Sequence, residues 1–291
     1  RFPIGKMAII ATGFFDGVHI GHRLVIETLV QTARERGEES VIITLWPHPR
    51  IVLHSDALGF RLLNTLDEKI NLLRGLGVNR VEVLPFTEEF SKTSTADYLE
   101  KYIRDRFGGT AILLGYDNRI GHDSGSPAQI AEIAAGIGLE VIRTDKVSNV
   151  GIAVSSTKIR QALLSGDVLT ASKFLCYDYS LDGEVVHGSK RGRTIGYPTA
   201  NMDLYEKMKL IPAEGAYLTK VRLGERRFYG MTNIRHIIET HILDFDEEIY
   251  GASMRLEFVK KLRDEMQFND LQTLKLQLLE DEKACRAMID I

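Results

Sequence analysis

The chain has 291 residues, which suggests roughly two domains of about 150 residues each. Its 37 basic and 40 acidic residues give a formal net charge of -3, so we expect neither nucleic acid nor a membrane surface as a partner. Two cysteines, Cys176 and Cys285, are too few for a disulfide framework. The sequence has no run of about 18 apolar residues, the length that a membrane-spanning helix needs. We therefore expect a cytoplasmic protein without an obligatory protein partner. Because the sequence begins at Arg1, we also expect that further residues precede it.

The first half of the chain alternates short apolar runs with helical patterns. This alternation predicts βαβ units and a parallel sheet. Ligands of such sheets bind at the carboxyl ends of the strands, so the functional residues should gather there. The predicted strands are 8–12, 40–45, 81–85, 111–115 and 140–144, and the predicted helices are 22–36, 66–75, 95–107 and 127–137.

The stretch from Gly13 to His22, GFFDGVHIGH, joins the first predicted strand to the first predicted helix. Amides at a helix N-terminus attract anions, and glycine lets a phosphate approach the backbone closely. His19 and His22 add ring donors that can be cationic. A histidine pair is often only a cap and a solvated side chain, but the strand, glycine turn and amphipathic helix together favour a phosphate site.

Two further stretches follow predicted strands at the same edge. In Trp46-Pro47-His48-Pro49-Arg50, two prolines fix an extended backbone that presents His48 and Arg50, although a rigid exposed loop explains the pattern equally well. Asp117 lies between two glycines at a strand end, which an ordinary βα turn would also explain.

A second helix start carries hydroxyls and cations. Ser155-Ser156-Thr157-Lys158-Ile159-Arg160 opens a helix whose buried side should hold Ile159, Leu163 and Leu164. Serine and threonine there are usually caps, but the neighbouring cations make a second anion site an alternative. Two phosphate-binding helix starts in one domain would suggest a triphosphate.

From about Cys176 onward, β-type runs replace the alternation. Gly224-Glu225 should close a hairpin. Because no helical pattern interrupts the strands until residue 271, we predict an antiparallel barrel or sandwich with a C-terminal helix. The predicted elements are strands at 183–186, 216–222, 228–234, 238–243 and 253–259 and a helix at 271–288.

The loop from Gly188 to Asn201, GSKRGRTIGYPTAN, interleaves glycines with cations and suits a polyphosphate. Thr199 and Asn201 then offer neutral oxygens of the kind that Mg²⁺ accepts beside phosphate. A solvated charged loop remains the alternative.

Together these motifs resemble the family of bacterial bifunctional riboflavin kinase/FAD synthetases, over nearly the whole chain. In the first half the resemblance rests on G-x-F-D-G-V-H-x-G-H, P-H-P, L-D-E-K, G-Y-D and S-S-T-K-I-R, and in the second on V-H-G, G-R-T-I-G-Y-P-T-A-N, P-A-E-G, E-T-H-I-L-D-F, Y-G and R-D-E. It implies an α/β architecture with a Rossmann-like nucleotidylyltransferase domain at 1–177, which adenylylates FMN to FAD, and an antiparallel β-barrel riboflavin kinase domain at 178–291.

The resemblance also implies roles for single residues. In the kinase, Glu239 would be the base, Thr199 and Asn201 would hold Mg²⁺ and ATP, and Arg263 would lie near the flavin. We expect Asn201 and Glu239 on neighbouring β-elements that face a common cavity. In the adenylyltransferase, the triphosphate would be held by His19, His22, Ser156, Thr157 and Arg160. Further ATP contacts would be Gly13, Phe15, Asp16, Gly17, Gly192 and Gly196, and further flavin contacts Pro47, His48 and Asn118.

The chain departs from the family at several positions. The family usually has Phe or His at Asn118, and glycine is common at Cys176. The family also has a longer segment before Glu239, and a tight two-residue hairpin at Arg235-His236 would need a positive φ that arginine resists. We therefore expect residues to be missing between Asn233 and Glu239. Two alternatives to the bifunctional enzyme are an adenylyltransferase whose impaired kinase domain senses flavin, and a flavin-binding regulator without catalysis.

Overall fold

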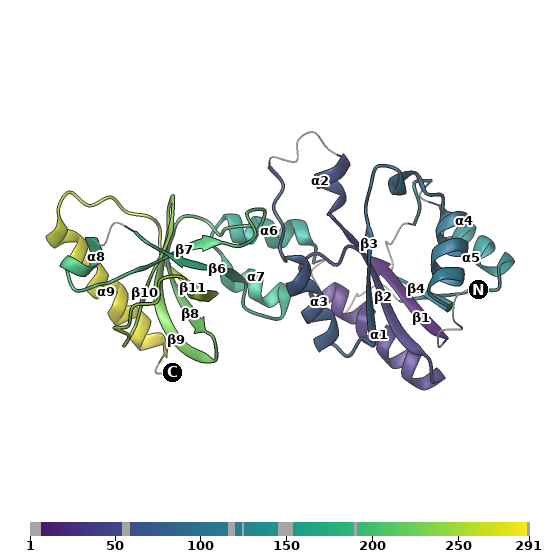
Figure 1. Ribbon diagram of the computed structural model, residues 1–291, viewed down its shortest axis with the longest axis horizontal. Helices are drawn as coiled ribbons and strands as arrows, with labels where there is room; N and C mark the ends of the chain where they lie inside the picture. Colours follow the sequence, from purple (N-terminus) through teal and green to yellow (C-terminus); the bar gives the residue numbers. More distant parts are fainter. Residues whose placement is uncertain are drawn as a thin grey trace. The chain divides into compact units, whose positions relative to one another are not determined.

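The computed structural model describes residues 7–53, 59–115, 120–123, 125–144, 154–188 and 191–289. The chain divides into two compact units, Arg1–Ser155 and Ser156–Ile291, and each is described by itself (Figure 1).

The first unit is built on a parallel sheet of five strands in the order β3-β2-β1-β4-β5. The predicted alternation of strands and helices is confirmed, whereas the short helix α2 was not expected. The strands are β1 (Ala8–Gly13), β2 (Glu39–Trp46), β3 (Arg80–Pro85), β4 (Gly109–Leu114) and β5 (Glu140–Arg143). The helices are α1 (Ile20–Arg36), α2 (Pro49–Leu53), α3 (Leu66–Gly75), η2 (Phe90–Lys92), α4 (Thr95–Asp97), which continues as the π-helical η3 (Tyr98–Arg106), and α5 (Pro127–Gly136).

Both faces of this sheet are covered, which explains why its strands are apolar at consecutive positions. Alternate residues of a strand point to opposite faces. Ile9 of β1 packs with Ile26 of α1, and the next residue, Ile10, packs with Ile103 of η3 and Ala134 of α5. Figure 1 shows α1 and α3 on one side of the sheet and α4, η3 and α5 on the other.

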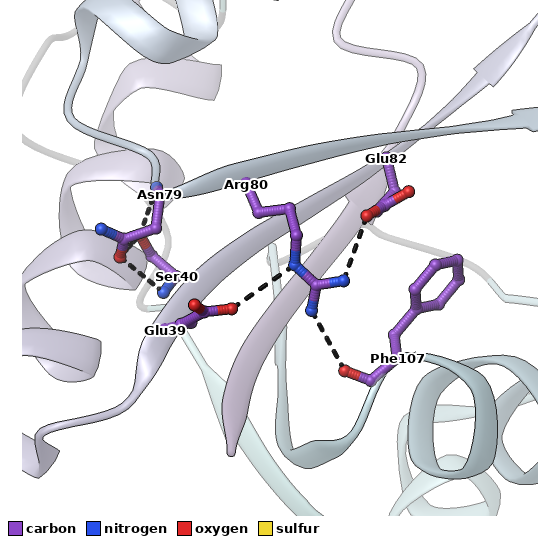
Figure 2. Close-up of polar contacts among 6 residues, drawn as sticks. All are labelled: Glu39, Ser40, Asn79, Arg80, Glu82 and Phe107. Atoms are coloured by element: carbon purple, nitrogen blue, oxygen red, sulfur yellow. Dashed lines mark hydrogen bonds and ion pairs between the residues drawn. The ribbon is translucent and has the colours of Figure 1, made fainter. Parts of the chain in front are cut away.

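The amino ends of the strands are tied by an ionic network around Arg80 (Figure 2). Its guanidinium contacts Glu82 at 3.1 Å and Glu39 at 3.5 Å, and it donates to the Phe107 carbonyl at 3.3 Å. These contacts link β3, β2 and the end of η3. Because ligands of parallel sheets bind at the opposite, carboxyl edge, we assign this network to stability.

The second unit contains a closed antiparallel barrel in the order β10-β7-β6-β11-β8-β9. The predicted barrel, its C-terminal helix and the hairpin at Gly224 are confirmed, but β7 was missed because we interpreted its first residues only as the end of a loop. The strands are β6 (Ser180–Val186), β7 (Ala200–Leu204), β8 (Gly215–Leu223), β9 (Arg226–Ile234), β10 (Ile238–Ile242) and β11 (Ser253–Arg263). The helices are α6 (Ser156–Leu164), α7 (Val168–Leu175), α8 (Arg191–Thr194) and α9 (Leu271–Ile289).

Threonines mark the inside of the barrel and α9 covers part of its outside. Thr219, Thr232 and Thr240 are fully buried, and their hydroxyls lie 2.8 and 2.9 Å apart across β8, β9 and β10. Met231 of β9 points the other way and packs with Cys285 of α9. Odd-numbered residues of β9 and β10 therefore lie on the outer face.

The chain is continuous between β9 and β10, so our expectation of missing residues there is wrong. Ile234 pairs directly with Ile238, and the Arg235 amide donates to the Ile237 carbonyl at 3.1 Å. The loop has three residues instead of the two that we assumed, and none of them adopts a positive φ. The steric objection to arginine therefore does not apply.

Candidate active sites

The turn after β1 presents two stacked histidines at the start of α1. His19 is the N-cap, and its Nδ1 accepts from the His22 amide at 3.4 Å. The two rings stack with centroids 3.7 Å apart and an interplanar angle of 14°. Because Nδ1 of His19 accepts, the neutral ring carries its proton on Nε2, which can donate to an anion. The structure thus brings both predicted histidines together at a helix N-terminus.

The surroundings of His22 disfavour the cationic form that the sequence allowed. Burial lowers its pKa well below the usual value, and the neighbouring His19 and Lys69 lower it further. Its Nδ1 is buried and has no hydrogen-bond partner among the described residues. A neutral His22 can still orient a phosphate through a hydrogen bond. Positive charge near this turn comes from Lys69 and from Arg23, whose Nε donates to the Val18 carbonyl at 3.1 Å.

The same turn has a strained backbone that its surroundings hold in place. Phe15 and Val18 have φ values of 48° and 39°, a region that non-glycine residues rarely adopt. Between them, Asp16 Oδ1 accepts from the amides of Leu63 at 3.1 Å and Asn64 at 3.4 Å. The predicted ATP contacts Phe15, Asp16 and Gly17 therefore belong to one fixed turn, and Gly13 is the last residue of β1 before it.

Lys69 is a residue whose role the sequence analysis missed. Its ammonium group is buried beside the turn and donates to the Phe14 carbonyl at 2.9 Å and to Thr44 Oγ1 at 3.3 Å. Burial lowers its pKa to about 8, opposed by the Asp16 carboxylate. The available signal was the L-D-E-K motif, which we used only as a sign of the family.

Aromatic side chains surround the predicted flavin contacts Pro47 and His48. The His48 ring stacks on Phe60 at 4.5 Å and lies 5.2 Å from Phe14, so it is close to the histidine turn. We expected an extended backbone throughout this stretch, but it is helical from Pro49, which begins α2. Asn118 and Asp117 lie outside the described residues.

The second predicted helix start belongs to the second compact unit. Ser156, Thr157 and Arg160 lie at the start of α6, whereas the histidine turn lies in the first unit. Ile159 and Leu163 are buried as expected, but Leu164 is 62% exposed, because adjacent helical residues point about 100° apart. The contact of these residues with a triphosphate stays a prediction.

In the barrel, the predicted kinase residues Asn201 and Glu239 lie in a row with Asn233 across three strands. Glu239 of β10 pairs with Asn201 of β7 on one side and with Asn233 of β9 on the other. Residues paired in this way share a face, here the outer one, because Thr240 points inside. The expected placement of Asn201 and Glu239 on neighbouring strands is confirmed, whereas a common cavity between them stays a prediction.

The surroundings of Glu239 make its carboxylate more basic than an ordinary one. Burial raises the pKa of its carboxyl group, and the Glu265 carboxylate raises it further. Glu265 lies 3.8 Å from the Arg235 guanidinium. Arg263, predicted to lie near the flavin, is held by Asp281 of α9 at 2.7 Å. Its contact with flavin stays a prediction.

The glycine loop before β7 is closely packed around its predicted ATP contacts. A side chain at Gly192 would overlap the Tyr197 carbonyl oxygen, and one at Gly188 would overlap the Asn201 amide. Gly196 has a φ of +89°, which suits glycine. Of the loop's cations, Arg193 pairs with Glu248 at 3.1 Å. Ser189 and Lys190 lie outside the described residues.

Thr199 and Asn201 fit a magnesium ion that is shared with phosphate. Their side chains lie two residues apart at the start of β7, and Asn201 Oδ1 is buried without a hydrogen-bond partner among the described residues. A buried oxygen of this kind needs a donor or a cation. The described part of the chain contains no cluster of three or more His, Cys, Asp or Glu side chains that could hold a metal.

The two units thus define two classes of protein: a nucleotidylyltransferase-like parallel sheet with histidines at its first helix, and a kinase-like barrel with paired Asn and Glu. Family models agree with this division, since FAD synthetase matches residues 3–158 and riboflavin kinase matches residues 175–289. The chain belongs to the family of bifunctional riboflavin kinase/FMN adenylyltransferases.

Relatives match along nearly the whole chain. The bifunctional riboflavin kinase/FMN adenylyltransferase of Listeria monocytogenes is 36% identical, with 96% of this chain and 91% of that protein covered. The protein of the same description from Bacillus subtilis is 33% identical, with 95% and 90% covered. A solved structure described as a macrolide-efflux protein from Streptococcus pneumoniae has a TM-score of 0.87 and 30% identity, covering 96% of this chain and 94% of that one. Among the described helices of this chain, none is both long and apolar enough to cross a membrane.

Proposed function

We propose that this chain phosphorylates riboflavin to FMN with ATP and then adenylylates FMN to FAD with release of pyrophosphate. One observation carries the proposal: a single chain contains both sites. Glu239 pairs with Asn201 in the barrel, and His19 stacks on His22 in the first unit. The family assignment supports both activities, and no feature of the described residues favours an impaired kinase.

In the kinase reaction, Glu239 accepts the proton of the terminal ribityl hydroxyl as that oxygen attacks the γ-phosphorus of ATP, and ADP leaves. Thr199 and Asn201 would hold Mg²⁺, which when bound neutralises phosphate charge. The raised pKa of Glu239 makes it a better proton acceptor than an ordinary carboxylate. The glycine loop then positions the triphosphate close to the backbone.

In the adenylyl transfer, an oxygen of the FMN phosphate attacks the α-phosphorus of ATP and pyrophosphate leaves. The amides at the start of α1 and the ring donors of His19 and His22 stabilise negative charge as it moves to the leaving group. His48 and Phe60 offer aromatic surfaces for the flavin ring. No covalent intermediate with the protein is needed.

The test uses ATP labelled at one phosphorus. With riboflavin and γ-labelled ATP, the label should enter FMN and remain in FAD. With α-labelled ATP, the label should enter FAD but never FMN. Label from α-labelled ATP in FMN, or FAD formed only when FMN is added, would contradict the proposal.

A further inference from the structure

Asn233 occupies a place beside the proposed base that none of the predicted roles explains. It lies on β9, directly opposite Glu239 and on the same outer face. Asn201 lies opposite Glu239 on the other side. Neighbouring strands are about 4.8 Å apart, so Glu239 is flanked by one amide side chain at about that distance on each side.

The carbonyl oxygen of the Asn233 side chain is buried and accepts no hydrogen bond from the described residues. An unpaired buried acceptor destabilises a folded protein, and such groups usually have a partner. The shielded oxygen lies next to the carboxyl group on which the kinase reaction depends. A ligand that supplies a donor at this place would remove the cost.

The chemistry of the substrates decides which donor this is. Phosphate oxygens carry few protons at neutral pH, so the triphosphate offers Asn233 almost no donor. A magnesium ion held by Asn201 is a poorer partner, because β10 lies between the strands that carry Asn201 and Asn233. Their backbones are two strand spacings, about 10 Å, apart, so both side chains would have to reach across Glu239 to share one ion. The flavin substrate, by contrast, carries a chain of hydroxyl groups next to the reacting one.

We propose that Asn233 is a substrate-binding residue of the kinase site, and that its side-chain carbonyl accepts a hydrogen bond from a ribityl hydroxyl next to the one that is phosphorylated. The inference rests on the proposed kinase function and adds a reason for substrate choice. Flavins with a hydroxylated chain satisfy the buried oxygen, whereas flavins with a plain alkyl chain leave it unpaired. A site built in this way rejects the analogue that lacks the hydroxyl.

The test compares two substrates in two proteins. Riboflavin is compared with a flavin that carries a 5-hydroxypentyl chain, which keeps only the reacting hydroxyl. The variant is Asn233→Leu, which keeps the branching and the number of heavy atoms of the side chain and removes the acceptor, with Asn233→Ala as a smaller second variant. We expect kcat/KM for riboflavin to fall about tenfold in both variants, while kcat/KM for the hydroxypentyl flavin changes less than about twofold.

Two controls separate this role from others. Adenylylation of added FMN by the same variants should not change, because Asn233 is not among the residues predicted for that reaction, and circular dichroism of each variant shows whether it is folded. Asn201→Ala should instead raise the Mg²⁺ concentration needed for half-maximal kinase activity, and the Asn233 variants should not.

Each other outcome overturns the inference. Equal losses for both flavins would mean a structural role, no loss for either would mean no role, and a changed Mg²⁺ requirement would mean a cation ligand. If the unaltered protein phosphorylates neither flavin, the proposed function itself fails, and the inference fails with it.

Discussion

The ammonium group of Lys69 lies 2.9 Å from the carbonyl oxygen of Phe14, immediately before the strained Phe15 of the histidine turn. A buried lysine thus fixes the backbone from which the phosphate-binding amides begin. We expect Lys69→Met to lower kcat/KM for FMN adenylylation about tenfold while riboflavin phosphorylation is retained. Steady-state assays of both reactions on one preparation measure this.

A matched control for Lys69 is Arg80→Ala. Arg80 also makes several contacts in the first unit, but at the amino edge of the sheet (Figure 2). This variant should be less stable and keep its adenylylation rate at a temperature where it is folded. Equal losses of adenylylation in both variants would show that general stability, and not the turn, sets the rate.

The low pKa of Lys69 has a consequence for stability. Its pKa is about 8 in the folded protein and 10.5 in the unfolded chain, so between these values the unfolded chain binds more protons. The free energy of unfolding contributed by this group therefore rises with pH across that window. Urea unfolding from pH 7 to 9.5 should show the native protein gaining stability relative to Lys69→Met. If the difference in the free energy of unfolding between the two proteins does not change with pH, the pKa of Lys69 is not lowered by burial.

Gly188 makes room for Asn201, because a Cβ atom at Gly188 would overlap the Asn201 side-chain nitrogen. We expect Gly188→Ala to displace Asn201 and to lower kinase activity at least about tenfold, without loss of FMN adenylylation. Gly224→Ala is the control: a Cβ atom there meets nothing within 4 Å, although its φ of +59° costs about 1 kcal/mol. If Gly188→Ala keeps its kinase activity, the position of Asn201 is not important for the reaction.

Cys176 ends α7 in the left-handed conformation, with a φ of 63°. Glycine adopts this conformation without the steric cost that a Cβ atom adds. Cys176→Gly should therefore raise the free energy of unfolding of the second unit by about 1 kcal/mol. Within the described part of the chain, its exposed thiol has only a weak contact to lose, with the Lys173 carbonyl at 3.9 Å. Unchanged or lower stability on urea unfolding would show that the strain is relieved elsewhere.

The parts of the fold that depend on local patterns could be predicted from the sequence. The buried strands and helices of the first unit follow from apolar periodicity, although α1 begins at Ile20, two residues before its predicted start, with His19 as its cap. The strand β7 was missed because its residues Ala200–Leu204 directly follow a glycine-rich loop. The β9–β10 hairpin was misjudged because strand register decides the loop length, and register is a property of the whole barrel.

The site was predictable where residues are close in sequence and less so where distant residues meet. Burial, which makes His22 neutral and lowers the pKa of Lys69, arises only once α3 packs against the turn. The row of Asn201, Glu239 and Asn233 likewise depends on pairing among three strands. The domain boundary at residue 177 stays a prediction. The compact units divide at Ser155, which groups α6 and α7 with the barrel, whereas the two family matches leave residues 159–174 unassigned.

The central claim is that two separate sites in one chain act in sequence through free FMN. The most direct measurement follows riboflavin, FMN and FAD by chromatography for Glu239→Gln, for His22→Ala and for their mixture, each with ATP and Mg²⁺. Glu239→Gln should leave riboflavin unchanged but convert added FMN to FAD. His22→Ala should accumulate FMN, with adenylylation lowered at least about tenfold, and the mixture should convert riboflavin to FAD. Loss of both activities in either variant, or a mixture that forms no FAD, would contradict the account.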